Sequence, residues 1–165
     1  MGRIRRAVGR RGDRMQLKIE AEFNPDDLED ELDDIKNRSR DFTSVFSRIE
    51  EDLRKHWAGS FASNGLPVGG WAPLDAKYAA WKATHFPGAT MVRSGKLFKS
   101  LSERHGATSD IGRHDARFGT KIEYAKFHQM GTSKMPKRQL VYEPAEANLK
   151  WSGWVKDHLE GTGDG

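Results

Sequence analysis

Apolar and polar side chains alternate strictly over residues 15–23. Polar or charged residues separate the apolar positions, which are Met15, Leu17, Ile19, Ala21 and Phe23. A period of two places successive side chains on opposite faces of an extended chain. The pattern therefore predicts a half-buried β-strand over this segment.

A second and longer pattern begins at Pro25 and continues to about Trp57. Apolar residues recur there at spacings of alternately four and three, with Ser39 filling the one gap: Leu28, Leu32, Ile35, Phe42, Phe46, Ile49 and Leu53. This spacing keeps one stripe of a helix apolar, and Asn24 and Pro25 suit its N-cap and first turn. The pattern predicts one continuous helix, roughly 50 Å long at ~1.5 Å per residue. We expect part of so long a stripe to pack on a neighbouring molecule.

Shorter elements follow. Glycine and proline make residues 64–74 a loop, and short helices are expected over residues 75–82, 96–100 and 124–130. Strands are expected near residues 101–105, 115–118 and 139–142, with a polar connection over residues 106–114. Pro144 opens a C-terminal helix that presents Ala147, Trp151, Val155 and Leu159 on one face.

These elements together predict an α+β fold, in which one long amphipathic helix packs on a small, mainly antiparallel sheet with short peripheral helices. We expect three regions in the chain: a basic flexible arm over residues 1–14, a single domain over residues 15–160 and a flexible tail over residues 161–165.

Charge is unevenly distributed along the 165 residues. The net charge is +4, but residues 1–14 alone carry +5, from six arginines and one aspartate, so the remainder sums to −1. Hydrophobic residues make up only 36% of the chain, and its mean hydropathy is −0.80. A core this lean is expected to be completed by contacts between copies in an oligomer.

Candidate chemistry is sparse. There is no cysteine, which excludes disulfides and cysteine–zinc sites, and no apolar run is long enough to predict a membrane span. No phosphate-binding loop and no nucleophile elbow is present. The histidines lack metal-ligand spacing, and the seven carboxylates of residues 26–34 are interpreted as a solvated helix face. We expect no enzyme activity, no cofactor and no metal. The histidines are His56, His85, His105, His114, His128 and His158.

The arginines of the N-terminal arm are the one signal for nucleic acid. Guanidinium groups can contact phosphates without reading base sequence. A solvated arm, or one that binds a protein partner, explains the same residues. The residues concerned are Arg3, Arg5, Arg6, Arg10, Arg11 and Arg14.

Further along the chain, five short elements stand in a characteristic order: Gly-Trp-x-Pro-Leu, Ser-Gly-x-Leu-x-x-Ser, Gly-Thr, Tyr-Ala with a following His-Gln-x-Gly-Thr, and Pro-x-Arg. Over roughly residues 42–142, this order resembles the tailed-phage virion morphogenesis family, which includes tail-completion and neck proteins. The residues that carry the resemblance as motif or subunit-interface positions are Trp71, Pro73, Leu74, Tyr78, Lys82, Gly95, Leu97, Ser100, Tyr124, Ala125, His128, Gly131 and Arg138.

The resemblance implies a structural virion protein at the head–tail junction, assembled in the host cytoplasm. Several copies would form a ring, as a hexamer or dodecamer, that joins the connector to the tail tube. Connector, tail-terminator or tail-tube proteins would be its neighbours, with passing DNA as a further candidate partner and no membrane. Two other hypotheses are a DNA-binding accessory protein that uses the arginine arm and a metal-dependent hydrolase.

Individual motif residues have expected roles. Trp71 either fills a pocket on a partner or folds back on its own domain. Gly95 and Gly131 suit helix ends or turns that need positive φ. Tyr124 and His128 share a helix face and are expected to lock the short helix to the sheet. Arg138 either pairs with an acidic group on an adjacent subunit or is solvated.

Overall fold

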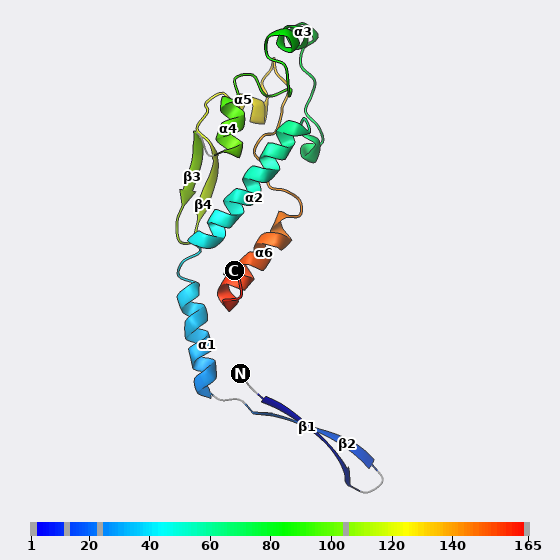
Figure 1. Ribbon diagram of the computed structural model, residues 1–165, viewed down its shortest axis with the longest axis vertical. Helices are drawn as coiled ribbons and strands as arrows, with labels where there is room; N and C mark the ends of the chain where they lie inside the picture. The colour runs from blue at the N-terminus through cyan, green and yellow to red at the C-terminus, as the bar shows by residue number, and fades with distance from the viewer. Residues whose placement is uncertain (1–2, 12–13, 23–24, 104–105, 164–165) are drawn as a thin grey trace.

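The computed structural model describes residues 3–11, 14–22, 25–103 and 106–163. The predicted α+β class is confirmed, with helices and antiparallel strands arranged along one long axis (Figure 1). The elements in chain order are β1 (Arg3–Arg11), β2 (Arg14–Glu22), α1 (Pro25–Arg38), α2 (Thr43–Ala62), the 3-10 turn η1 (Leu66–Val68), α3 (Ala76–His85), α4 (Lys96–Ser102), β3 (Ala107–Ile111), β4 (Ala116–Thr120), α5 (Ala125–Met130) and α6 (Ala147–Glu160).

The N-terminal segment is a β-hairpin. Strand β2 confirms the alternating pattern, and β1 occupies residues 3–11 of the segment for which the sequence predicted a flexible arm. The antiparallel register sets Arg3 opposite Glu22 and Arg5 opposite Glu20.

The predicted single long helix is wrong, because residues 39–42 divide it into α1 and α2. Asp41 makes the division: its Oδ1 accepts hydrogen bonds from the backbone N–H of Thr43 at 2.9 Å and from the Thr43 hydroxyl at 2.6 Å. The first N–H groups of a helix have no partner within it, so an oxygen that accepts from one of them favours the start of α2 at Thr43. The backbone N–H of Phe42 donates to the carbonyl of Arg113 at 2.9 Å, so the division also ties the two helices to the β3–β4 turn.

The hydrophobic core lies along α2. Leu53, Trp57 and Phe61 are buried on one face of that helix and pack against Leu97 and Leu101 of α4. Trp71, Ala125 and Leu140 complete the buried cluster. Residues from loops and short helices therefore complete a core that is built on one face of α2.

An ion pair inside α2 fixes the end of α4. Arg54 and Glu50 are buried and bonded one turn apart, and Arg54 Nη1 also donates to the carbonyls of Ser100 at 3.2 Å and Leu101 at 3.1 Å. The last carbonyls of a helix lack partners within it. The buried arginine therefore satisfies the end of α4.

The strand predicted near residues 101–105 is misplaced. Helix α4 continues to Ser102, residues 104–105 lie outside the described residues, and the strand is β3, within the predicted polar connection. Polar residues suit β3 because it belongs to a two-stranded sheet, with Ser109 and Asp110 exposed. Its partner β4 confirms the strand predicted near residues 115–118.

The strand predicted over residues 139–142 is also wrong. This segment is extended, but its partner is the side chain of Gln129 from α5. The Gln129 Oε1 accepts from the backbone N–H of Leu140 at 2.8 Å and of Val141 at 3.0 Å, and its Nε2 donates to the Val141 carbonyl at 2.8 Å. One amide side chain thus takes the place of a neighbouring strand.

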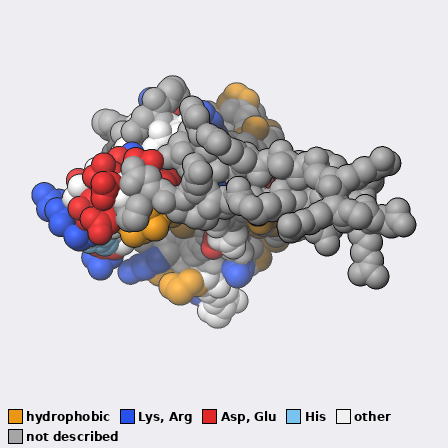
Figure 2. Space-filling model, turned by 90° about the horizontal axis from the view of Figure 1, so that it is seen from below, with side chains coloured by type: hydrophobic (Ala, Val, Ile, Leu, Met, Phe, Trp, Pro, Cys, Tyr) orange, Lys and Arg blue, Asp and Glu red, His pale blue; other side chains and the backbone are white. Residues whose placement is uncertain are grey.

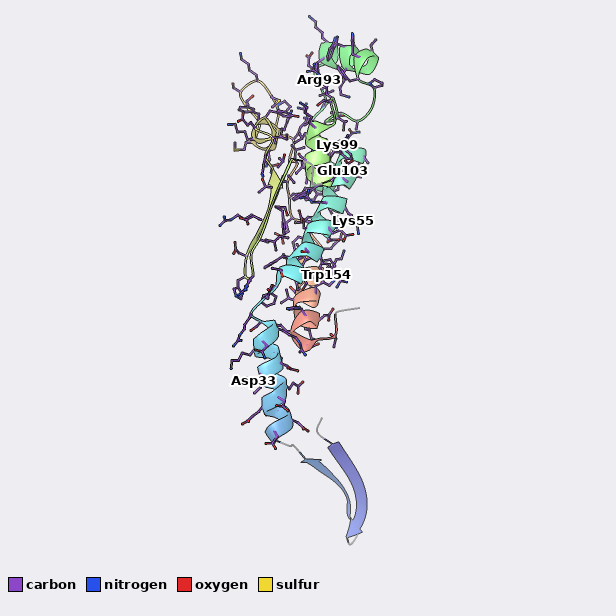
Figure 3. All side chains as sticks on the ribbon, turned by 60° about the vertical axis from the view of Figure 1, so that its left-hand side comes forward. Asp33, Lys55, Arg93, Lys99, Glu103 and Trp154 are labelled. Carbon is purple, nitrogen blue, oxygen red and sulfur yellow. The ribbon has the colours of Figure 1, made fainter. Side chains whose placement is uncertain are left out.

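The predicted C-terminal helix is α6, which packs beside α2 (Figures 1 and 3). Asp52 of α2 accepts from Trp151 Nε1 at 3.0 Å and pairs with Lys150. The guanidinium of Arg48 lies 4.3 Å from the ring centroid of Trp154. These polar and cation–π contacts hold a helix that buries little apolar surface.

Candidate assembly site

Eight of the thirteen motif residues line a single cavity of about 830 Å³. It lies among α3, α4, α5 and the segment of residues 134–138, and we call it the motif pocket. Elements more than sixty residues apart in the chain meet there. The eight residues are Pro73, Leu74, Tyr78, Gly95, Leu97, Tyr124, His128 and Arg138.

Hydrogen bonds from Arg138 and Trp71 join the two segments that form the floor of the motif pocket. Arg138 Nε donates to the Ala72 carbonyl at 2.9 Å, and Nη2 donates to the Pro73 carbonyl at 2.8 Å. Trp71 Nε1 donates in turn to the Gln139 carbonyl at 2.8 Å. The Gly-Trp-x-Pro loop and the Pro-x-Arg segment therefore hold each other in place.

This geometry bears on the alternatives for both residues. Trp71 folds back on its own domain, where its ring meets Phe61 edge-on at a centroid distance of 5.3 Å. The expectation of a solvated Arg138 is wrong, because the side chain is only 4% exposed and donates to backbone carbonyls of its own chain. Its pairing with an acidic group on an adjacent subunit stays a prediction.

Gly131 allows the two segments to approach. It ends α5 with φ of 76°, and a Cβ there would lie 2.9 Å from the backbone nitrogen of Lys137. The neighbouring N–H of Arg138 donates to the His128 carbonyl at 2.7 Å. The prediction of positive φ is confirmed at this residue and at Gly95, which begins α4 with φ of 76°.

Lys82 shapes the loop that follows α3. Its side chain is buried, and Nζ donates to the carbonyls of Phe86 at 3.0 Å, Gly88 at 3.3 Å and Ala89 at 3.0 Å. An ammonium group has three donors, and here each finds a carbonyl. The family motif lysine thus folds the chain between α3 and α4 into one wall of the motif pocket.

Ser100 has a similar internal role. It is fully buried, its Oγ donates to the Leu97 carbonyl at 2.8 Å, and the hydroxyls of Ser100 and Thr120 lie 2.6 Å apart. The Thr120 hydroxyl also accepts from the N–H of Ile122 at 3.1 Å. The Ser-Gly-x-Leu-x-x-Ser and Gly-Thr elements are therefore joined by hydroxyl groups.

Tyr124 and His128 share one face of α5, with ring centroids 6.2 Å apart. They line the motif pocket, and their expected role in locking α5 to the sheet stays a prediction. Ala125, which is buried, and Gln129 also hold that helix. Burial, and then the charge of Arg138, lowers the pKa of His128. Its Nδ1 is buried and has no hydrogen-bond partner among the described residues.

The rim of the motif pocket is aromatic and exposed. Tyr78 is 38% exposed, Tyr124 43% and Phe127 45%. The guanidinium of Arg93, an exposed side chain, lies 5.2 Å from the ring centroid of Phe86 and 5.3 Å from that of Trp81. Sequence reasoning missed Phe127 and Arg93 as site residues, although Arg93 directly precedes the Ser-Gly element.

The lining carries an excess of positive charge. Arg93, Lys134 and Arg138 are its arginine and lysine residues, and Asp75 is its one carboxylate. Asp75 is committed to capping α3, where it accepts from the N–H groups of Lys77 and Tyr78. The ion pairs found among the described residues involve none of the three cations. The pocket thus combines aromatic surface with cations for which the described residues provide no ion-pair partner.

The six arginines of the N-terminus lie elsewhere. Five belong to β1, and Arg14 begins β2, so they gather in one hairpin at the end of the molecule away from α3 (Figure 1). Within the described ranges, no group of three or more histidine, aspartate or glutamate side chains is arranged to hold a metal ion. No helix in the described part has the length and apolarity needed to cross a membrane.

The motif pocket is built from residues that the sequence singled out by their order. A model of the phage virion morphogenesis family matches residues 23–151, which include every one of the thirteen motif residues. No match was found among curated proteins or among solved structures. The family match spans most of the chain and begins just after the hairpin. The chain therefore belongs to the phage virion morphogenesis family.

Proposed function

We propose that this protein is a non-enzymatic structural component of a tailed-phage virion at the head–tail junction. Several copies would form a ring, a hexamer or dodecamer, that joins the connector to the tail tube. The family supports a role in building the virion. The location, the ring and the neighbouring proteins belong to the proposal.

The observation that carries the proposal is the motif pocket. A soluble chain rarely leaves a concave aromatic surface open to water unless a partner covers it. Here most of the motif residues line that surface or hold its floor together. Their arrangement builds a receptor for another protein segment and, among the described residues, contains no evident set of catalytic groups.

Exposed apolar residues on other elements support an oligomer. Leu28 and Leu32 of α1 are 53% and 56% exposed, and Leu149 of α6 is 87% exposed. Such positions gain free energy when a neighbour buries them. In a ring, each subunit presents one surface to the next copy and a different surface to the previous one.

Cryo-electron microscopy of intact particles tests this function. The expected result is a ring of density at the neck into which α2, α4 and the β3–β4 sheet fit as one unit. A neck in which every density is accounted for by other polypeptides would reject the proposal. Mass spectrometry of the same purified particles shows independently whether the chain is a virion component.

A second candidate function, DNA binding, is favoured by the arginine-rich hairpin. A two-stranded β-ribbon fits the major groove of DNA, and the sequences of β1 and β2 contain six arginines. Binding through these residues would be independent of base sequence and would weaken steeply with salt.

Replacing Arg5, Arg6 and Arg10 with glutamine tests this candidate. We expect DNA affinity to fall and the slope of log affinity against log salt concentration to decrease by about 3. The matched control replaces three arginines outside the hairpin, Arg40, Arg113 and Arg117, which are exposed. Equal effects of the two triple variants would rule out a specific role for the hairpin.

A further inference from the structure

We propose that the motif pocket receives helix α1 of a neighbouring copy of this chain, with Leu28 and Leu32 as the side chains that enter it. This inference rests on the proposed function and names the contact that would join one subunit of the ring to the next.

Helix α1 has the pattern of a segment that docks in a groove. Leu28, Leu32 and Ile35 stand at positions i, i+4 and i+7, the spacing by which an amphipathic helix inserts one face into a groove. Leu28 and Leu32 are more than half exposed, whereas Ile35 is partly covered. The end of the apolar stripe near Pro25 thus lacks a covering element among the described residues of its own chain.

Charge complementarity identifies the motif pocket as the surface that fits α1. The helix carries seven carboxylates and two cations, Lys36 and Arg38, a net charge of −5. The pocket lining has three cations and one carboxylate, and that carboxylate is held in a helix cap. Seen from the end that carries α1, acidic side chains gather beside hydrophobic ones on the surface (Figure 2). Of the three cations, Arg138 is buried in the floor, whereas Arg93 and Lys134 are exposed. An acidic, leucine-bearing helix suits an aromatic pocket with these two exposed cations in its lining.

The two surfaces lie far apart along the long axis of the molecule. Figure 3 shows Asp33 of α1 well separated from Arg93 of the motif pocket, and Figure 1 shows the same separation between α1 and α3, with α2 and the β3–β4 sheet between them. A chain therefore cannot place its own α1 in its own pocket. The contact joins different surfaces on successive copies, which is the kind of interface that generates rings or filaments.

The division of the apolar stripe at residues 39–42 gives α1 its separate role. Because Asp41 starts a new helix at Thr43, α2 follows the core while α1 leaves it. Arg38 still anchors the end of α1 through its Nη1, which donates to the Leu159 carbonyl of α6 at 2.9 Å. The C-terminal end of α1 is thus fixed to α6, while the rest of the helix extends away from the core and is available to dock on another molecule.

Cysteine cross-linking in virions tests the contact, and the absence of natural cysteine makes the result specific. The first variant carries Leu32→Cys and Phe127→Cys, and a second pair is Leu28→Cys with Tyr78→Cys. The matched control keeps Leu32→Cys and places the second cysteine at Leu149, an exposed leucine on α6. All of these side chains are exposed, and urea unfolding verifies that each variant is folded.

Purified virions are treated with a short bis-maleimide, and the chain is detected on a denaturing gel. We expect a ladder of cross-linked copies with either pocket pair, at least about tenfold stronger than with the control, because adjacency raises the effective concentration of the two thiols. Variants without the pocket cysteine should give single chains only.

The outcomes separate the inference from the function on which it rests. If the chain is present in the virion neck but both pocket pairs give no more ladder than the control, the α1 contact is wrong and the structural role stands. The α1 contact is equally wrong if the pocket cysteine links to another virion protein and not to α1. If virions lack the chain altogether, the proposed function fails and the inference fails with it.

Discussion

Arg138 offers the sharpest test of how the motif pocket is built. Its side chain is 4% exposed and binds the carbonyls of Ala72 and Pro73, so that one guanidinium joins two motif elements sixty-five residues apart. Replacing it with methionine keeps an unbranched stem of moderate length and removes both donors. The variant therefore measures what the two hydrogen bonds contribute.

The expected magnitude follows from the contacts. Each hydrogen bond from a charged group contributes about 1.5–3 kcal/mol, or about 3–6 kcal/mol for the pair. Desolvation opposes this, and burial lowers the pKa of Arg138 for the same reason. We expect Arg138→Met to reduce the free energy of unfolding by about 2–4 kcal/mol. For a chain of this length, that change lowers Tm by about 4–16 °C.

Urea unfolding, followed by tryptophan fluorescence, measures the change. Arg93→Met is the matched control, because Arg93 borders the same pocket, is exposed, and lies over the rings of Trp81 and Phe86. Its effect should stay within about 1 kcal/mol. Arg138→Lys should fall between the two, since an ammonium lacks the planar fork that reaches both carbonyls. If Arg138→Met unfolds like the parent, the pocket floor does not depend on this residue and the reasoning is refuted.

Three further predictions concern the surrounding structure. Gly65→Ala should destabilise the protein by about 2–4 kcal/mol, because φ is 78° and the new Cβ would lie 2.3 Å from the ring of Trp71. The control is Gly59→Ala, at an exposed helical position where a new Cβ meets no atom within 4 Å, and it should be neutral or stabilising. Equal losses of Tm in the two variants would contradict this explanation. Burial lowers the pKa of His128 in the folded protein. As pH falls below about 6.5, this histidine is therefore protonated first in the unfolded chain, and the free energy of unfolding should decrease until the pH reaches the folded-state pKa. The variant His128→Gln should lose less stability than the parent between pH 7 and pH 5, and parallel curves of stability against pH would refute the assignment. Gln129→Leu should reduce the free energy of unfolding by about 2–4 kcal/mol, because it removes three hydrogen bonds to the extended segment of residues 139–142. The loss should appear as a lower urea midpoint, together with faster hydrogen exchange confined to that segment.

Local patterns in the sequence were sufficient for several elements. Period-two alternation placed β2, and the short helix predicted over residues 75–82 corresponds to α3, because such signals act over a few neighbouring residues. The order of the Trp71, Gly95 and Arg138 elements also indicated the family. These features need no knowledge of which distant residues meet.

Other features depended on partners that only the folded chain supplies. The strand predicted at residues 139–142 fails because the Gln129 side chain, and not a second strand, satisfies its backbone. The single long helix fails because Asp41 accepts a hydrogen bond from the first N–H of a new helix, while the N–H of Phe42 donates to the distant Arg113 carbonyl. A continuous apolar stripe in the sequence gives no sign of the hydrogen bonds that replace the predicted strand and divide the predicted helix.

The sequence by itself determined that this chain has an α+β fold, a basic N-terminus and the ordered motif of its family. The tertiary structure decided what the motif residues do: Trp71 and Arg138 fold inward to hold loops together, while Tyr78 and Tyr124 border an open pocket. The physical reason is that side-chain identity fixes which bonds a residue can make, whereas burial and geometry across the chain fix which of those bonds it makes.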